Sequence, residues 1–169
     1  MQTLERNLNA LIVVILSCIL LGAFGVQIFK HEQPCPLCLL QRLGMIGVAC
    51  GALMNLKFGV RTLHYGLSLL SSLTGGFVAI RQWFLHICPN TPTFGTPFWG
   101  LNLYTWSFII FVSTVTAIAL LLIFFRHSDR KMHLRLNGWS FFAFVFMFLI
   151  ACANAVVTLY LCGLTPCEG

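Results

Sequence analysis

Residues 8–29 read LNALIVVILSCILLGAFGVQIF, an apolar run without a charged side chain. A helix needs about 20 such residues to cross a hydrocarbon core. Four further runs of comparable length follow, at 39–56, 63–86, 103–125 and 138–161. In lipid a spanning segment must satisfy its own backbone hydrogen bonds, and these runs lack the alternation of barrel strands. We therefore predict an all-α integral membrane bundle of five transmembrane helices, forming one domain over residues 1–169.

The composition leaves little room for structure outside the bilayer. The 169 residues are 59% hydrophobic and 8% charged, with a mean hydropathy of +0.90, whereas a soluble domain carries about 25% charged residues. The first run is longer than the core of a signal peptide, and no small-residue cleavage site follows it, so we expect an uncleaved span. The net charge of +6 comes from basic residues that flank these spans, which gives no support to nucleic-acid binding.

The basic residues predict the orientation of the chain. Seven of them fall on one side if the spans alternate: Arg6, Lys57, Arg61, Arg126, Arg130, Lys131 and Arg135. The other side holds only Lys30, Arg42 and Arg81. Because Lys and Arg are enriched in cytoplasmic loops, we predict a cytoplasmic N-terminus. After an odd number of spans, the C-terminus is then expected outside.

The eight cysteines divide according to this topology. Cys18, Cys50 and Cys152 lie within spans, where we expect them to be small apolar packing residues. The other five map to the outer side: Cys35, Cys38, Cys88, Cys162 and Cys167. Disulfides persist in such oxidising compartments. A zinc site wants four Cys or His ligands, and the chain has no second CxxC motif, so we predict redox chemistry and no metal.

The most informative motif is Cys35-Pro36-Leu37-Cys38, with Gln41 and Arg42 one turn later. Two thiols at i and i+3 can close a short disulfide. Thiolates are favoured at helix N-termini, so Cys38, at or near the start of the second span, is the better candidate for the thiolate. Arg42 lies on the same helix face and leans back toward the sulfurs. An arginine near a span end can also simply snorkel to the interface.

The stretch CPLCLLQR at 35–42 resembles the motif of the bacterial disulfide bond formation protein B (DsbB) family, and the resemblance extends roughly over residues 8–125, including YTWSF at 104–108. It implies a four-helix core in the bacterial inner membrane, to which this chain adds a fifth helix. It also implies reoxidation of a periplasmic DsbA-like dithiol oxidase, with ubiquinone or menaquinone as electron acceptor. Cys35 and Cys38 would then face the quinone, and Arg42 would support its binding and reduction.

Other polar residues near the outer ends of the spans are weaker candidates for the quinone site. We predict that Gln41, Arg81 and His86 contribute to it, although Arg81 and His86 also suit a purely interfacial role. His64, by contrast, lies toward the cytoplasmic side and is expected to be a solvated flank.

Two departures from the family pattern concern the partner-facing thiols. The family carries a cysteine pair in the second outer loop, where this chain has only Cys88. The fifth span is followed by a tail with Cys162 and Cys167. We expect either that the tail pair takes over the shuttle role or that Cys88 pairs with a tail cysteine.

Two other functions remain compatible with the sequence. One is a non-catalytic membrane protein with structural disulfides on its outer face. The other is an enzyme like vitamin K epoxide reductase, which has the same thiol and quinone chemistry in a differently arranged helix bundle. A CxxC motif followed by Arg42 favours the quinone-linked dithiol oxidase.

Overall fold

The computed structural model describes residues 2–30, 35–86, 97, 99–124 and 138–162. Its five helices are α1 (Gln2–Lys30), α2 (Pro36–Phe58), α3 (Thr62–Leu85), α4 (Leu103–Phe124) and α5 (Gly138–Cys162). Each is long and apolar enough to cross a membrane. The predicted helical membrane bundle is thus confirmed. The second helix begins at Pro36 rather than at Leu39, which brings Cys38 into its first turn.

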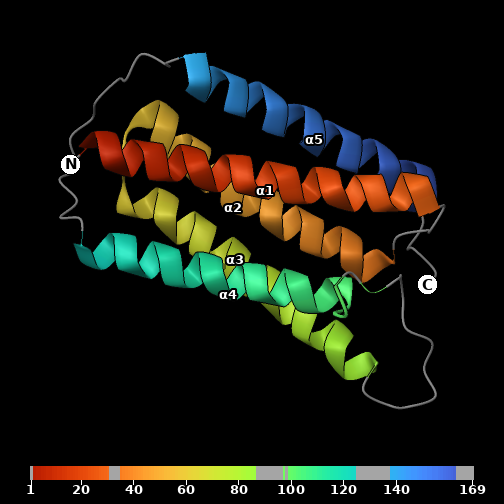
Figure 1. The fold of residues 1–169 in the computed structure, drawn as a ribbon. Helices are drawn as coiled ribbons and strands as arrows, with labels where there is room; N and C mark the ends of the chain where they lie inside the picture. Colours follow the sequence, from red (N-terminus) through yellow and green to blue (C-terminus); the bar gives the residue numbers. More distant parts are fainter. Residues whose placement is uncertain (1, 31–34, 87–96, 98, 125–137, 163–169) are drawn as a thin grey trace.

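Successive helices run in opposite directions along the bundle (Figure 1). We call the end at which α2 begins and α5 finishes the thiol end. Helix α1 packs on α2, α2 on α3, and α3 on α4, while α5 lies against both α1 and α2. The fifth helix therefore covers the α1–α2 seam, on the opposite side of the bundle from α4 (Figure 1).

The apolar core lies where α1, α2 and α5 meet. It includes Leu16 and Leu20 of α1, Met45 of α2, and Met147 and Ile150 of α5, all nearly inaccessible to solvent. These side chains recur at three- and four-residue spacing, as expected for the buried stripe of a packed helix.

Helices α2 and α3 lie close together because glycines of α2 face α3. A Cβ atom added to Gly51 would lie 2.6 Å from the backbone oxygen of His64 and would also collide with the Ser68 hydroxyl. Ser68 in turn donates a hydrogen bond to the backbone oxygen of Val48 at 3.0 Å. The absence of a side chain at position 51 therefore sets the separation of the two helices.

A buried polar cluster joins α1, α2 and α3 at the end opposite the thiol end. Asn9 Nδ2 donates to the Tyr65 hydroxyl at 2.8 Å, and Asn55 Nδ2 donates to Asn9 Oδ1 at 3.1 Å. The Tyr65 hydroxyl donates to Glu5 Oε1 at 3.3 Å, and His64 Nδ1 donates to Asn55 Oδ1 at 2.9 Å. His64 is buried, so the expectation of a solvated flank is wrong. The asparagine on the neighbouring helix gives its ring a partner inside the bundle.

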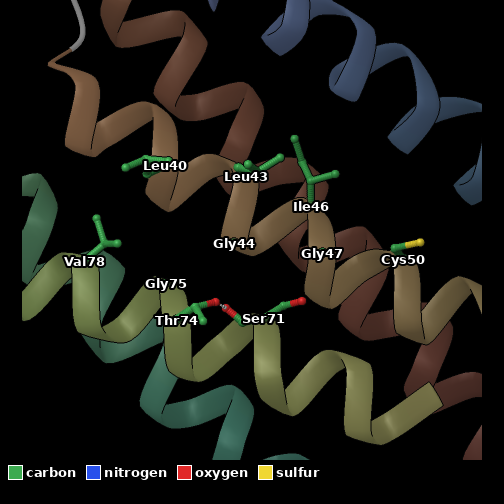
Figure 2. Close-up of a pocket in the computed structure, with 10 residues that line it drawn as sticks. All are labelled: Leu40, Leu43, Gly44, Ile46, Gly47, Cys50, Ser71, Thr74, Gly75 and Val78. Carbon is green, nitrogen blue, oxygen red and sulfur yellow. Dashed lines mark hydrogen bonds between the residues drawn. The ribbon is translucent and has the colours of Figure 1, made fainter. Parts of the chain in front are cut away.

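The cysteines within the spans do not pack in the core. Cys18, Cys50 and Cys152 are all exposed on the outside of the bundle, so the expectation of packing residues is wrong. A helix that is apolar on all sides does not reveal in its sequence which face is buried. Cys50 lies at a groove of about 360 Å³ between α2 and α3, which Gly47, Ser71 and Gly75 also line (Figure 2).

Candidate redox site

The N-terminus of α2 is built by its first cysteine. Cys35 is the N-cap, with extended backbone angles of φ −66° and ψ 154°, and Pro36 follows in the first turn, where its missing N–H costs no helix hydrogen bond. The backbone oxygen of Cys35 accepts from the N–H groups of Cys38 and Leu39 at 3.0 and 3.2 Å. Cys35 Sγ also accepts from Cys38 N at 3.2 Å. The same residue thus starts the helix and holds one of the two sulfurs at its N-terminus.

The two sulfur atoms are in direct contact. Cys35 Sγ and Cys38 Sγ lie 2.7 Å apart in a hydrogen bond between thiols. Cys35 is buried and Cys38 half-buried. The hydrogen bond with Cys38, followed by burial, raises the pKa of the Cys35 thiol. Of the two sulfurs, Cys35 is therefore the one whose protonated form is favoured.

The sulfurs also contact a buried glutamine, Gln82, which was not among the residues predicted from the sequence. Gln82 of α3 is 1% exposed. Its Nε2 donates to Cys35 Sγ at 3.3 Å and to Cys38 Sγ at 3.5 Å. Its Oε1 accepts from Gln41 Nε2 at 2.6 Å. The signal in the sequence is an uncharged polar residue inside a membrane span, where polar groups are rare and usually functional.

Arg42 turns its guanidinium toward α1. Nη1 donates to Gln27 Oε1 at 2.8 Å, and Nη2 donates to the backbone oxygen of Ala23 at 3.3 Å. Its Cζ lies 4.8 Å from the centre of the Phe24 ring. The side chain is buried, and its charge interacts electrostatically with both cysteine sulfurs. Arg42 thus places a buried positive charge in the seam between α1 and α2, one turn after Cys38.

The remaining predicted residues make no direct hydrogen bond to the sulfurs among the contacts described. Gln41 reaches them through Gln82. His86 closes α3, where its Nδ1 donates to the backbone oxygen of Gln82 at 2.7 Å and its ring stacks on Tyr104. Arg81 is exposed on the outside of the bundle.

The structure describes the side chain of none of the three cysteines predicted to face the partner. Cys88 and Cys167 lie outside the described residues. Cys162 is the last residue of α5, and its side chain is likewise outside what is described.

Comparison with known proteins identifies a family for this chain. The family model described as "Disulfide bond formation protein DsbB" matches residues 5–94. A protein named Disulfide bond formation protein B from Azoarcus sp. is 35% identical over 97 residues, covering 53% of this chain and 58% of the relative. One of the same name from Ralstonia nicotianae is 40% identical over 80 residues, covering 47% and 50%.

These matches leave part of each protein unaligned. The chain spans about half the length of the curated relatives it matches. No solved structure matches it. The family match nevertheless covers more than half of the chain and includes both cysteines of the motif, Gln41, Arg42 and Gln82. The chain therefore belongs to the DsbB family of disulfide bond formation proteins.

Proposed function

We propose that this protein is a membrane thiol–disulfide oxidoreductase that reoxidises a periplasmic DsbA-like dithiol oxidase and passes the electrons to a membrane quinone. The main support for this proposal is the contact between Cys35 and Cys38 at the N-terminus of a helix long and apolar enough to cross a membrane. The amide donors of Gln82 contact this pair, and the buried charge of Arg42 follows one turn after Cys38 in α2.

The chemistry of the pair is a two-electron cycle. A donor dithiol reduces the Cys35–Cys38 disulfide, so the S–S bond breaks and the donor acquires a disulfide in its place. Reoxidation of Cys35 and Cys38 forms the S–S bond again and releases two electrons and the proton of the Cys35 thiol. A quinone held at this site would accept the two electrons, together with that proton and one proton from solvent. Cys38, in the first turn of α2, is the sulfur better placed to carry the thiolate, because the helix N-terminus favours negative charge.

The residues around Arg42 fit a quinone. A guanidinium carries five N–H donors, and the two hydrogen bonds of Arg42 to α1 leave others for a carbonyl oxygen. Phe24 adds an aromatic ring beside the charge. Arg42 would hold a quinone oxygen and stabilise the negative charge that develops there, as oriented donors do in a water-poor site. Gln41, Arg81 and His86 remain predicted contributors to this site.

A second pair of thiols would connect Cys35 and Cys38 to the soluble partner. We assign this role to Cys162 and Cys167, with Cys88 as the alternative partner of either. In support, α5 finishes at the same end of the bundle at which α2 begins (Figure 1). Both ends would face the periplasm of a bacterial inner membrane, and the N-terminus would face the cytoplasm.

Replacement of Cys38 tests the proposal directly. The purified protein in lipid nanodiscs receives a small dithiol and a water-soluble quinone, and quinone reduction is followed by absorbance. Cys38→Ser is expected to lower the rate to the uncatalysed background, because no disulfide can form at the motif. Cys50→Ser removes a cysteine from the outside of the same helix and is the matched control, with an unchanged rate. Full activity of Cys38→Ser would refute the proposal and favour structural disulfides.

A further inference from the structure

Two buried glutamines from different helices form a hydrogen-bonded chain that ends on the sulfurs. Gln41 of α2 is 3% exposed and Gln82 of α3 is 1% exposed. Gln41 Nε2 donates to Gln82 Oε1 at 2.6 Å. Gln82 Nε2 then donates to Cys35 Sγ at 3.3 Å and to Cys38 Sγ at 3.5 Å. Both N–H groups of one amide are therefore used on the two reacting atoms.

The first glutamine fixes the orientation of the second. An amide offers an oxygen acceptor on one side and an NH₂ donor on the other. Gln82 Oε1 accepts from Gln41 and lies 3.9 Å from Cys38 Sγ, and the NH₂ group of Gln82 donates to both sulfurs. The backbone oxygen of Gln82 is also engaged, by His86 Nδ1 at 2.7 Å. The side-chain amide itself is held by Gln41 at its oxygen and by the two sulfurs at its NH₂ group.

Oriented donors of this kind distinguish the two redox states of the pair. A thiolate accepts N–H hydrogen bonds strongly, since a bond to an ionised group is about twice as strong as one between neutral groups. The sulfurs of a disulfide are neutral and weak acceptors. In a buried site the difference is larger than it would be in water. The amide of Gln82 therefore stabilises the reduced pair more than the disulfide.

We propose that Gln82 is a further catalytic residue of the redox pair and that Gln41 is its positioning residue. Together they stabilise the reduced form with a thiolate on Cys38, and so make the Cys35–Cys38 disulfide a stronger oxidant. The inference rests on the proposed function for its biological meaning. In the reduction, two electrons from the donor dithiol enter the sulfurs, one of its protons goes to Cys35, and the other goes to solvent.

The equilibrium between the pair and a thiol–disulfide buffer tests the inference without any quinone. The full chain is equilibrated at a series of ratios of reduced to oxidised dithiothreitol. Thiol trapping then gives the fraction of the Cys35–Cys38 pair that is reduced. Gln82→Leu is expected to shift the equilibrium about tenfold toward the disulfide, equivalent to a potential about 30 mV more negative. Alkylation of Cys38 by iodoacetamide at neutral pH should slow by a similar factor. If Gln82 only filled space, its replacement by leucine would change neither the redox equilibrium nor the alkylation rate.

Two further variants separate the donors from the rest of the side chain. Gln82→Glu keeps the shape and one oxygen but replaces the NH₂ group with a second oxygen, so it should shift the equilibrium in the same direction. Gln41→Leu should have a smaller effect, and none when Gln82 is already leucine, because it acts through that residue. Thr74→Val removes an exposed hydroxyl of α3 that bonds its own helix and serves as the matched control.

The outcomes are distinct. Wild-type equilibrium and alkylation rate in Gln82→Leu would overturn the inference, and so would wild-type behaviour of Gln82→Glu if Gln82→Leu fails to fold. If quinone fails to oxidise Cys35 and Cys38 in the wild-type protein, the proposed function is overturned. The result of the equilibrium measurement does not depend on that outcome.

Discussion

At the scale of single residues, local spacing accounts for part of the site. The interval between Cys35, Cys38 and Arg42 predicts that they share the first turns of one helix, and they do. It does not predict that the guanidinium of Arg42 hydrogen-bonds to Gln27 and Ala23. Those atoms belong to another helix, and the distance between helices is set by packing rather than by sequence interval. Arg42 therefore has a structural contribution in addition to its proposed effect on the quinone.

Arg42→Met should weaken quinone reduction far more than it weakens the bundle. Loss of one oriented donor at a reacting centre lowers turnover by about 10²-fold or more, whereas the lost hydrogen bonds to α1 contribute about 1 kcal/mol each. Quinone reduction rates over a range of quinone concentrations, alongside the thermal midpoint, measure both effects. Gln27→Leu is the control, since it removes a bond between the helices but keeps the charge. Equal losses of activity in Arg42→Met and Gln27→Leu would show that Arg42 acts only by joining α1 and α2.

The neighbours Arg81 and Gln82 show why the sequence alone does not single out the α3 residue that contacts the thiols. Arg81 stands out by its charge, yet it is exposed, while Gln82 is buried against both sulfurs. Adjacent residues of a helix point about 100° apart, so only one of the two can face α2. Which of them does so depends on the rotation of α3, and an apolar span with polar residues on several faces does not fix that rotation.

At the scale of elements, hydropathy predicted all five helices but not their buried faces. The bilayer demands length and apolar composition, both of which are visible in the sequence. In membranes close helix packing depends on small residues rather than on hydrophobicity, and contacts such as that of Gly51 with α3 appear only in the structure. The burial of His64 and the exposure of Cys50 follow from the same choice of faces.

Gly51→Ala should loosen the α2–α3 pair and lower the thermal midpoint in detergent. Its Cβ would meet the backbone oxygen of His64, which cannot move without shifting α3, and overpacking of this kind costs about 1–3 kcal/mol. Gly66→Ala provides the contrast, because nothing lies within 4 Å of its Cβ and alanine favours the helix by up to about 1 kcal/mol. A higher midpoint for Gly51→Ala than for wild type would show that the two helices adjust freely.

At the scale of the whole molecule, the site lies in the part of the chain that matches the family, and α5 lies beyond it. The matched residues end at position 94, while α4 and α5 begin at Leu103 and Gly138. Helix α5 nevertheless packs against α1 and α2, the helices that carry Arg42 and its partners. The resemblance of CPLCLLQR therefore predicted the redox pair, whereas it had no information on where an added helix would pack.

In the proposed function, Cys35 and Cys38 cycle between dithiol and disulfide under the control of the quinone pool. The direct measurement is their redox state in membranes, trapped by acid and a mass-shifting maleimide, in a chain whose other cysteines are replaced by serine. We expect a small dithiol to reduce the pair when quinone is absent, and added quinone to restore the disulfide within the time of one turnover. A pair whose state stays the same with and without quinone would contradict the account.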